Sequence, residues 1–219
     1  MDVFNVAVKF FQDGGVFMYI ILLVFALGVA IAIERYLYLT IAKQTNRSMW
    51  DKLTPLMKAN NYQQAMALSS RSKSEVGKIM AYGLSRLQVT RSRDDIEIAM
   101  EEGLMEVIPR LEKRTHYLAT YANIATLLGL LGTIIGLIQA FTAVANANPA
   151  DKADLLSASI SVAMNTTAFG LIAAIPLLLM FTVLQTKTTE IVDSMEMATV
   201  KFLNSITEHS KKTAPRSAN

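Results

Sequence analysis

The sequence predicts an all-α fold: a polytopic membrane protein with three transmembrane helices, of which the second and third extend into the cytoplasm as long helices. Of its 219 residues, 52% are hydrophobic and 18% are charged, against roughly 25% charged in soluble domains. The apolar residues are gathered into three uncharged blocks, each long enough to cross a bilayer as a helix. The stretches between the blocks place apolar residues at spacings of three and four, which is typical of helices.

This pattern predicts an order of segments along the chain. In that order we expect a periplasmic N-terminal segment at 1–15, a first transmembrane helix at 16–36, a cytoplasmic helical region at 37–116, a second transmembrane helix at 117–145, a periplasmic loop at 146–154, a third transmembrane helix at 155–186, and a cytoplasmic C-terminal helix and tail at 187–219.

The first block has one competing interpretation, a cleaved signal peptide. Residues 16–33 are uncharged and would form a helix of about 27 Å. The preceding residues are not basic, and no A-x-A cleavage site follows, so a transmembrane helix is favoured. The other two blocks exceed the ~20 residues that a bilayer requires, so they should tilt or project beyond it.

The distribution of cations predicts the orientation. Lysine and arginine lie almost wholly in 37–116 and 187–219, whereas the N-terminal segment holds only Lys9 and the loop is net negative. By the positive-inside rule the two basic regions are cytoplasmic, which places the N-terminus in the periplasm and the C-terminus in the cytoplasm. The same regions also carry many carboxylates, which favours a solvated helical surface over a nucleic-acid interface.

Several helices are predicted in the cytoplasmic region. Residues 62–68 and 75–87 have helical apolar spacing. Ser92 is suited to cap a further helix. We expect that helix to run uninterrupted from about Asp94 through the second span, with a bend at Pro109. The region after the third span keeps helical apolar spacing and should continue that span, with fraying at its end.

No motif in the sequence indicates an enzyme. Cysteine is absent and the two histidines are far apart, so neither a thiolate nucleophile nor a metal site is expected, and no cofactor is predicted. The stretch GLLGTIIG in the second span lacks the Lys-Ser/Thr ending of a phosphate loop. HExxH and GxSxG motifs are also missing.

The middle of every predicted span lacks ionisable side chains. Such a group would cost roughly 2.5–3.5 kcal/mol or more and would signal ion handling. This chain alone therefore cannot be a carboxylate-based proton relay. The spans do contain hydroxyl and amide side chains, above all Asn165, Thr166 and Thr167 in the third span and Thr133 in the second. Threonines can also bond their own helix carbonyls and be inert, and this alternative stays open.

Small residues in the same two spans predict close helix packing. Gly132 and Gly136 form a small-xxx-small pair, which lets helices approach closely. Gly129, Gly170 and Pro176 are assigned to helix packing as well.

Two stretches resemble the MotA/TolQ/ExbB proton-channel family. They are TYANIATLLGLLGTIIGLIQAF in the second span and NTTAFGLIAAIPLLL in the third, and together the matches cover about residues 123–179. The order of elements is also similar to that family. The count of three spans is similar to ExbB and TolQ rather than to the four-span MotA.

The resemblance implies a function and partners. It implies an ExbB-like subunit of an ion-driven motor in the bacterial inner membrane. The motor would convert proton motive force into mechanical work on the cell envelope, with TonB-dependent outer-membrane transport as the process driven. It implies a homopentamer around two copies of a single-span ExbD/TolR-like partner that carries the membrane Asp, with a TonB-like protein as a further partner and lipid around the complex. The pore-facing threonines of the family map onto Thr133 and Thr167, with Thr166 and Asn165 beside the path. Where ExbB and TolQ have Glu, this chain has Val162.

Two alternatives stay open. Within the family, the chain could be a TolQ-like or other stator-type subunit. In a different class, it could be a non-conducting membrane scaffold, which the uncharged spans would also suit. The sequence leaves open whether the ion is H⁺ or Na⁺.

Overall fold

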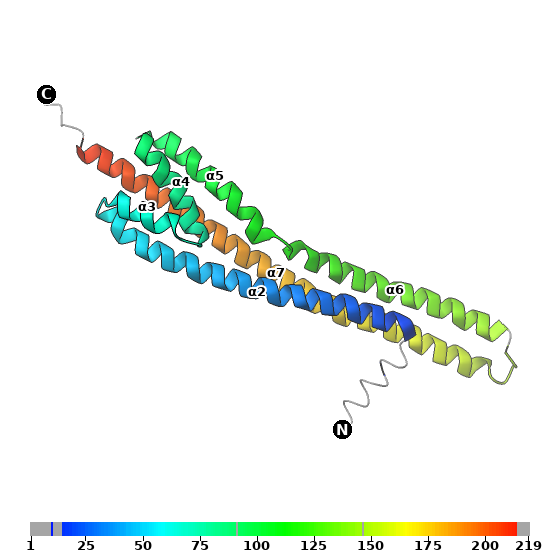
Figure 1. The fold of residues 1–219 in the computed structure, drawn as a ribbon. Coiled ribbons are helices and arrows are strands. Elements are labelled where there is room, and N and C mark those ends of the chain that lie inside the picture. Colours follow the sequence, from blue (N-terminus) through cyan, green and yellow to red (C-terminus); the bar gives the residue numbers. More distant parts are fainter. Residues whose placement is uncertain (1–9, 11–14, 91, 146, 214–219) are drawn as a thin grey trace, which may run out of the picture. The chain divides into compact units, whose positions relative to one another are not determined.

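The structure is a computed structural model that describes residues 10, 15–90, 92–145 and 147–213, with side chains described as far as residue 207. All its regular elements in that part of the chain are helices, so the all-α fold class is confirmed. In chain order these are α2 (Gly15–Lys58), α3 (Tyr62–Ser70), α4 (Glu75–Val89), α5 (Arg93–Glu112), α6 (Thr115–Ala145) and α7 (Lys152–Thr213) (Figure 1). Most of the predicted N-terminal segment 1–15 lies outside the described residues.

Three helical segments are long and apolar enough to cross a membrane: Gly15–Lys58, Arg93–Ala145 and Lys152–Thr207. The chain divides into two units, and α2 and α7 each contribute to both. The span unit comprises Met1–Arg35 and Arg114–Leu184. The second unit comprises Tyr36–Lys113 and Gln185–Asn219, and it is called the extramembrane unit because the sequence predicts that it lies outside the membrane.

Helix α2 continues well past the predicted end of the first span at residue 36. It is 44 residues long and ends at Lys58, with Pro55 inside its last turns. In the extramembrane unit its buried apolar side chains are Leu39, Met49, Leu53 and Met57. These positions follow helical spacing, so a second apolar stripe sustains the helix after the charged residues that follow the first span.

The expectation of one uninterrupted helix from Asp94 through the second span is wrong in one detail. Helix α5 ends at Glu112 and α6 begins at Thr115. Arg114, between them, has a φ of 65°, a left-handed conformation that ends helices. Pro109 does not cause the interruption, because its carbonyl still accepts a hydrogen bond of 3.1 Å from the N–H of Lys113.

In the span unit, α6 and α7 approach until their backbones touch. A methyl group added at Gly170 would lie 2.7 Å from the Ala125 carbonyl oxygen, and one at Gly129 would lie 3.2 Å from the Cα of Thr167. At Gly136 it would lie 2.9 Å from the Cβ of Ala163. Only glycine leaves room for this approach, which is how small residues bring membrane helices together.

Helix α2 joins the same packing through Gly28. A methyl group there would lie 2.7 Å from Cδ2 of Leu177 on α7. Pro176, directly before that leucine, lies within α7 and does not end it. The first and third spans are therefore held together at a glycine, like the second and third.

In the extramembrane unit, α4 lies between α3 and α5. A methyl group at Gly83 of α4 would lie 2.7 Å from Met100 of α5 and 3.1 Å from Phe202 of α7, so three helices meet there. The predicted Ser92 cap is present: its hydroxyl accepts a hydrogen bond from the N–H of Asp95. Capping of this kind removes one of the unpaired N–H groups with which a helix begins.

Asn46 of α2 caps the start of α4 from a distant part of the chain. Its side chain is 3% exposed, and its Oδ1 accepts hydrogen bonds from the N–H groups of Glu75 at 2.9 Å and Val76 at 3.2 Å. Those N–H groups belong to the first turn, so they have no acceptor within α4. One buried amide therefore fixes α4 against α2.

An ion pair joins α2 to α7 in the same unit. The Nζ of Lys43 lies 2.6 Å from the Oε2 of Glu190, and both side chains are about half exposed. The hydrogen bond from Lys43, together with its charge, lowers the pKa of the Glu190 carboxyl. Three residues earlier on α7, the Nζ of Lys187 lies 3.7 Å from the centroid of the Tyr36 ring.

Replacing Asn46 with leucine should loosen the start of α4. The change leaves two buried N–H donors unpaired, at about 1–3 kcal/mol each. Hydrogen exchange of the amides at residues 75–79 in the purified full-length protein should therefore become faster. The exposed Ser48→Ala on the same helix is the control, and equal protection in the two variants would refute this role of Asn46.

Replacing Gly170 with alanine should separate α6 from α7, because the added methyl group meets a backbone oxygen that cannot rotate away. Overpacking of this kind typically costs about 1–3 kcal/mol. The thermal unfolding midpoint in detergent should fall. Ala143→Val, a larger addition at an exposed position of α6, should change it little. A midpoint that Gly170→Ala leaves at the wild-type value would contradict the close contact.

The Lys43–Glu190 pair predicts a dependence of stability on acid pH. Because the folded protein lowers the pKa of Glu190, the contribution of this pair is present above the ordinary glutamate pKa of about 4.3 and is lost as the pH falls below it. The unfolding midpoint should drop less on acidification in Glu190→Gln than in wild type. Asp193→Asn is the control. The same acid-induced drop in wild type and Glu190→Gln would count against the pair.

Candidate ion-pathway threonines of α6 and α7

Thr133 of α6 and Thr167 of α7 meet at the contact between these helices. Their hydroxyl oxygens are directly hydrogen-bonded to each other, and both side chains are half-buried. Thr167 lies on the backbone that Gly129 touches, so the glycine contact brings the two hydroxyls within reach. The structure thus brings together the two threonines that the resemblance singled out.

Backbone carbonyls surround this pair with further acceptors. The hydroxyl of Thr167 donates to the Gly129 carbonyl across the helix contact at 2.9 Å. The hydroxyl of Thr133 lies 3.2 Å from the same carbonyl and 3.3 Å from the Ala163 carbonyl. Each hydroxyl has one hydrogen and two lone pairs, so it can donate to only one of these acceptors at a time. The pair therefore has several alternative hydrogen-bond arrangements.

These contacts bear on the alternative that the threonines only bond their own helices. Thr133 has such a contact with Gly129, four residues earlier in α6. The bonds of Thr167 to Gly129 and to Thr133 both cross from α7 to α6. Hydrogen bonding within its own helix therefore does not account for the contacts of the Thr167 hydroxyl.

The other two candidate path residues are placed differently. Thr166 is 2% exposed, donates its hydroxyl to the Val162 carbonyl at 3.0 Å, and has its methyl group against Gly132. Its side chain thus fills the α6–α7 contact. Asn165 is half-buried, and within the described residues its side-chain amide makes no hydrogen bond. Their assignment to the ion path stays a prediction.

Thr133 and Thr167 offer oxygen atoms, but no carboxylate lies near them in the sequence. Helix α6 contains no Asp or Glu, and α7 contains none between Asp154 and Glu190. At Val162, where the resemblance predicts Glu, the side chain is apolar and half-buried. In the described part of the chain, no cluster of His, Asp and Glu could hold a metal ion. The pair can accept and donate hydrogen bonds, but its chemistry needs an ionisable group from elsewhere.

The sequence did not predict that a backbone carbonyl would contact both threonine hydroxyls. It assigned Gly129 to packing alone, yet the Gly129 carbonyl faces both threonine hydroxyls. The position of Gly129 four residues before Thr133 was a signal for one of these contacts. The contact with Thr167 depends on the register between two helices, which the sequence pattern does not specify.

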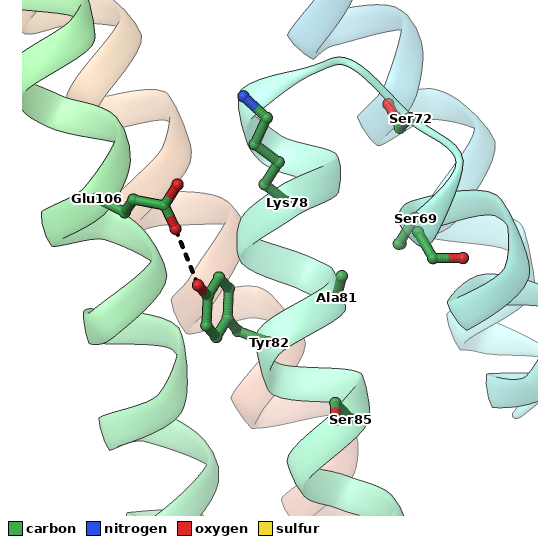
Figure 2. A pocket seen from close by; sticks show the side chains of 8 residues that line it. Ser69, Ser72, Lys78, Ala81, Tyr82, Ser85 and Glu106 are labelled. Atoms are coloured by element: carbon green, nitrogen blue, oxygen red, sulfur yellow. Dashed lines mark hydrogen bonds between the residues drawn. The ribbon is translucent and has the colours of Figure 1, made fainter.

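The extramembrane unit also contains a hollow lined by polar side chains. It has a volume of about 360 Å³ and is lined by serine hydroxyls, Lys78, Tyr82 and Glu106 (Figure 2). Its charged groups are already paired: Lys78 with Glu75, and Glu106 with Arg110. The hydroxyl of Tyr82 donates to Glu106 at 2.8 Å, and this bond raises the pKa of Tyr82. Neither an activated nucleophile nor a free base results from this arrangement.

Comparison with known proteins gives consistent matches. A family model described as the MotA/TolQ/ExbB proton channel family matches residues 71–197. An ExbB homolog of Methanothermobacter thermautotrophicus is 27% identical over 199 residues, which cover 90% of this chain and 69% of that protein. An ExbB-like biopolymer transport protein of Synechocystis is 30% identical over 70% of this chain and 72% of its own length.

A shorter match involves the other branch of the family. The Tol-Pal system protein TolQ of Haemophilus influenzae is 38% identical over 78 residues, 36% of this chain and 34% of that protein. The family match covers more than half of the chain and includes both Thr133 and Thr167. The chain therefore belongs to the MotA/TolQ/ExbB proton channel family.

Proposed function

We propose that this chain is the ion-conducting, ExbB-like subunit of a motor that converts the proton motive force into mechanical work on the cell envelope. It would lie in the bacterial inner membrane, with its N-terminus in the periplasm and its C-terminus in the cytoplasm. One observation carries the proposal: Thr133 and Thr167 are hydrogen-bonded to each other between two apolar helices that supply no carboxylate.

The missing carboxylate would come from another chain. Members of the family work in membrane complexes with ExbD/TolR-like partners. In the proposed complex, five copies of this chain surround two copies of such a single-span partner, whose membrane Asp binds the ion. A carboxylate within the bilayer is costly, so partner and threonines must meet where the oxygens of the pair can hydrogen-bond it.

The threonine pair would act as a stepping point for the ion. Each hydroxyl can accept a hydrogen bond while donating another, and the carbonyls of Gly129 and Ala163 offer alternative acceptors. A proton moving to the partner's Asp removes its charge, which changes how strongly its helix is held in the ring. Each elementary charge crossing the membrane releases about 2.3 kcal/mol per 100 mV, which is the energy available for the movement.

The process driven is proposed to be TonB-dependent transport through the outer membrane. In support, the matches to proteins named ExbB-like or ExbB homolog span more of this chain than the match to TolQ. A TolQ-like role is the alternative within the family, and a gene for a Pal-like protein beside this one would favour it. A TonB-like neighbour would favour the first.

A non-conducting scaffold is the alternative of a different class. The observation in its favour is the uncharged composition of α6. Purification separates the two functions: a motor retains a single-span partner with an Asp in its span, and a scaffold does not.

Replacing Thr167 with valine should slow ion conduction without preventing assembly. The variant keeps the shape of the side chain but removes a hydrogen bond to the moving ion or its carboxylate. Such bonds are worth about 1.5–3 kcal/mol, so the rate should fall roughly ten- to hundredfold. The measurement is proton uptake by liposomes containing the complex with its partner, under an imposed membrane potential.

Two further variants sharpen this experiment. Thr167→Ser keeps the hydroxyl and should retain most of the flux. Thr126→Val removes a hydroxyl of α6 that donates to the Ala122 carbonyl of its own helix, and it should have little effect. A normally assembled Thr167→Val complex that conducts like wild type would rule out the proposed role of this threonine.

A further inference from the structure

The extramembrane unit has opposite charges on two of its helical surfaces. Helix α5 contains seven carboxylates and two arginines. Residues 36–74, which include the second half of α2 and all of α3, contain six cations and one carboxylate. A single chain therefore presents one strongly acidic and one strongly basic segment in the same unit.

Helix α7 lies between α5 and the part of α2 that belongs to the basic segment. Its residues Glu190 and Ala198 line a hollow together with Lys43 of α2, whereas Glu196 and Leu203 line a groove together with α5. At 100° per residue, the first two positions lie on nearly the opposite face of α7 from the second two. Within this unit α2 and α5 accordingly lie on different sides of α7 (Figure 1).

The groove on the acidic side is apolar at its base. It has a volume of about 400 Å³ and lies between α5 and α7. Leu104, Ile108, Val200 and Leu203 line it, and Met105 stands at its edge with 72% of its surface exposed. An exposed apolar groove of this kind is typical of a surface that packs against another helix.

The rim of the groove is acidic. It consists of Glu97 and Glu101 on α5 and Glu196 on α7. Arg93 lies 3.8 Å from Glu97, but in the described part of the chain Glu101 and Glu196 have no ion pair. The groove therefore suits a helix whose cations have long apolar stems, because the stems can cover the base while the charged ends reach the rim.

The outer face of α2 carries more cations than carboxylates. Ser48, Lys52 and Pro55 are exposed and follow helical spacing, and exposed Asp51 and Arg47 lie beside them, so the face has two cations and one carboxylate. Neither Arg47 nor Lys52 has an ion pair among the residues that the structure describes. Ser48 and Pro55 are small enough for the helix to enter a groove, and the two cations flank them.

We propose that a second copy of this chain occupies the groove, with its α2 face, formed by Arg47, Ser48, Lys52 and Pro55, against the α5–α7 groove of its neighbour. The two surfaces are different and lie on different sides of α7, so the contact is head-to-tail and repeats from copy to copy until a ring closes. This inference rests on the ring of the proposed function and deepens it, because it names the surfaces that join neighbouring subunits outside the membrane.

Cysteine cross-linking tests this contact, and the absence of native cysteine makes every introduced thiol unique. Two differently tagged copies are co-expressed with the partner, one with Met105→Cys and the other with Ser48→Cys. A short bismaleimide is then added to the membranes. The expected product is a dimer carrying both tags. Lys201→Cys, exposed on α7 outside the groove, replaces Ser48→Cys as the matched control and should give none.

Charge reversal adds a test of specificity. Glu101→Lys with Glu196→Lys in the Met105→Cys copy should reduce the mixed dimer about tenfold or more, because it places like charges opposite each other. Arg47→Glu with Lys52→Glu in the Ser48→Cys copy should restore it. A cross-link that is insensitive to both changes, or one from Met105→Cys to the partner chain instead, would overturn the inference.

The mass of the purified complex separates this inference from the proposed function. If the complex keeps several copies of the chain and its ion flux but the mixed dimer does not form, the interface is wrong and the motor function stands. If the chain is a monomer beside its partner, the ring and the inference both fail. A mixed dimer within a complex of several copies supports both.

Discussion

The contact between α6 and α7 is the constraint on which the rest of the span unit depends. Gly129 and Gly170 leave no side chain between the two backbones, and no larger residue would fit there without displacing one of them. This approach brings Thr133 and Thr167 into direct hydrogen bonding and places the Gly129 carbonyl beside both. Packing and the candidate ion path are therefore one feature, since the residues that allow the contact also create the polar group within it.

The extramembrane unit is built by the same helices that enter the span unit. Helix α2 continues without interruption because a second apolar stripe, with Leu39 and Leu53 buried, follows the charged residues after the first span. Asn46 then fixes α4, and Lys43 reaches Glu190 of α7. A polar contact between distant parts of the chain thus determines where the shorter helices lie, while apolar packing supplies most of the stabilisation.

The sequence predicted the fold class and the Ser92 cap, because apolar blocks and capping residues are local signals. It did not predict that α2 continues to Lys58, since the charged residues after the first span suggested an end. It also missed the interruption at Arg114. This residue has a left-handed backbone, but it is neither glycine nor asparagine, the residues that usually indicate this conformation in a sequence. The family resemblance singled out Thr133 and Thr167 as pore-facing residues, but it did not predict their contact with each other. Its geometry depends on helix register, which no local pattern contains.

The central claim is that these spans conduct ions only with a carboxylate borrowed from another chain. Helix α6 has no acidic residue, and the hydroxyls of Thr133 and Thr167 are poor sites for a charge by themselves. The most direct measurement compares proton flux into liposomes that contain this chain alone with flux into liposomes that contain it with its single-span partner. The account predicts flux above that of empty liposomes only when the partner is present. Equal flux from the chain alone would contradict it.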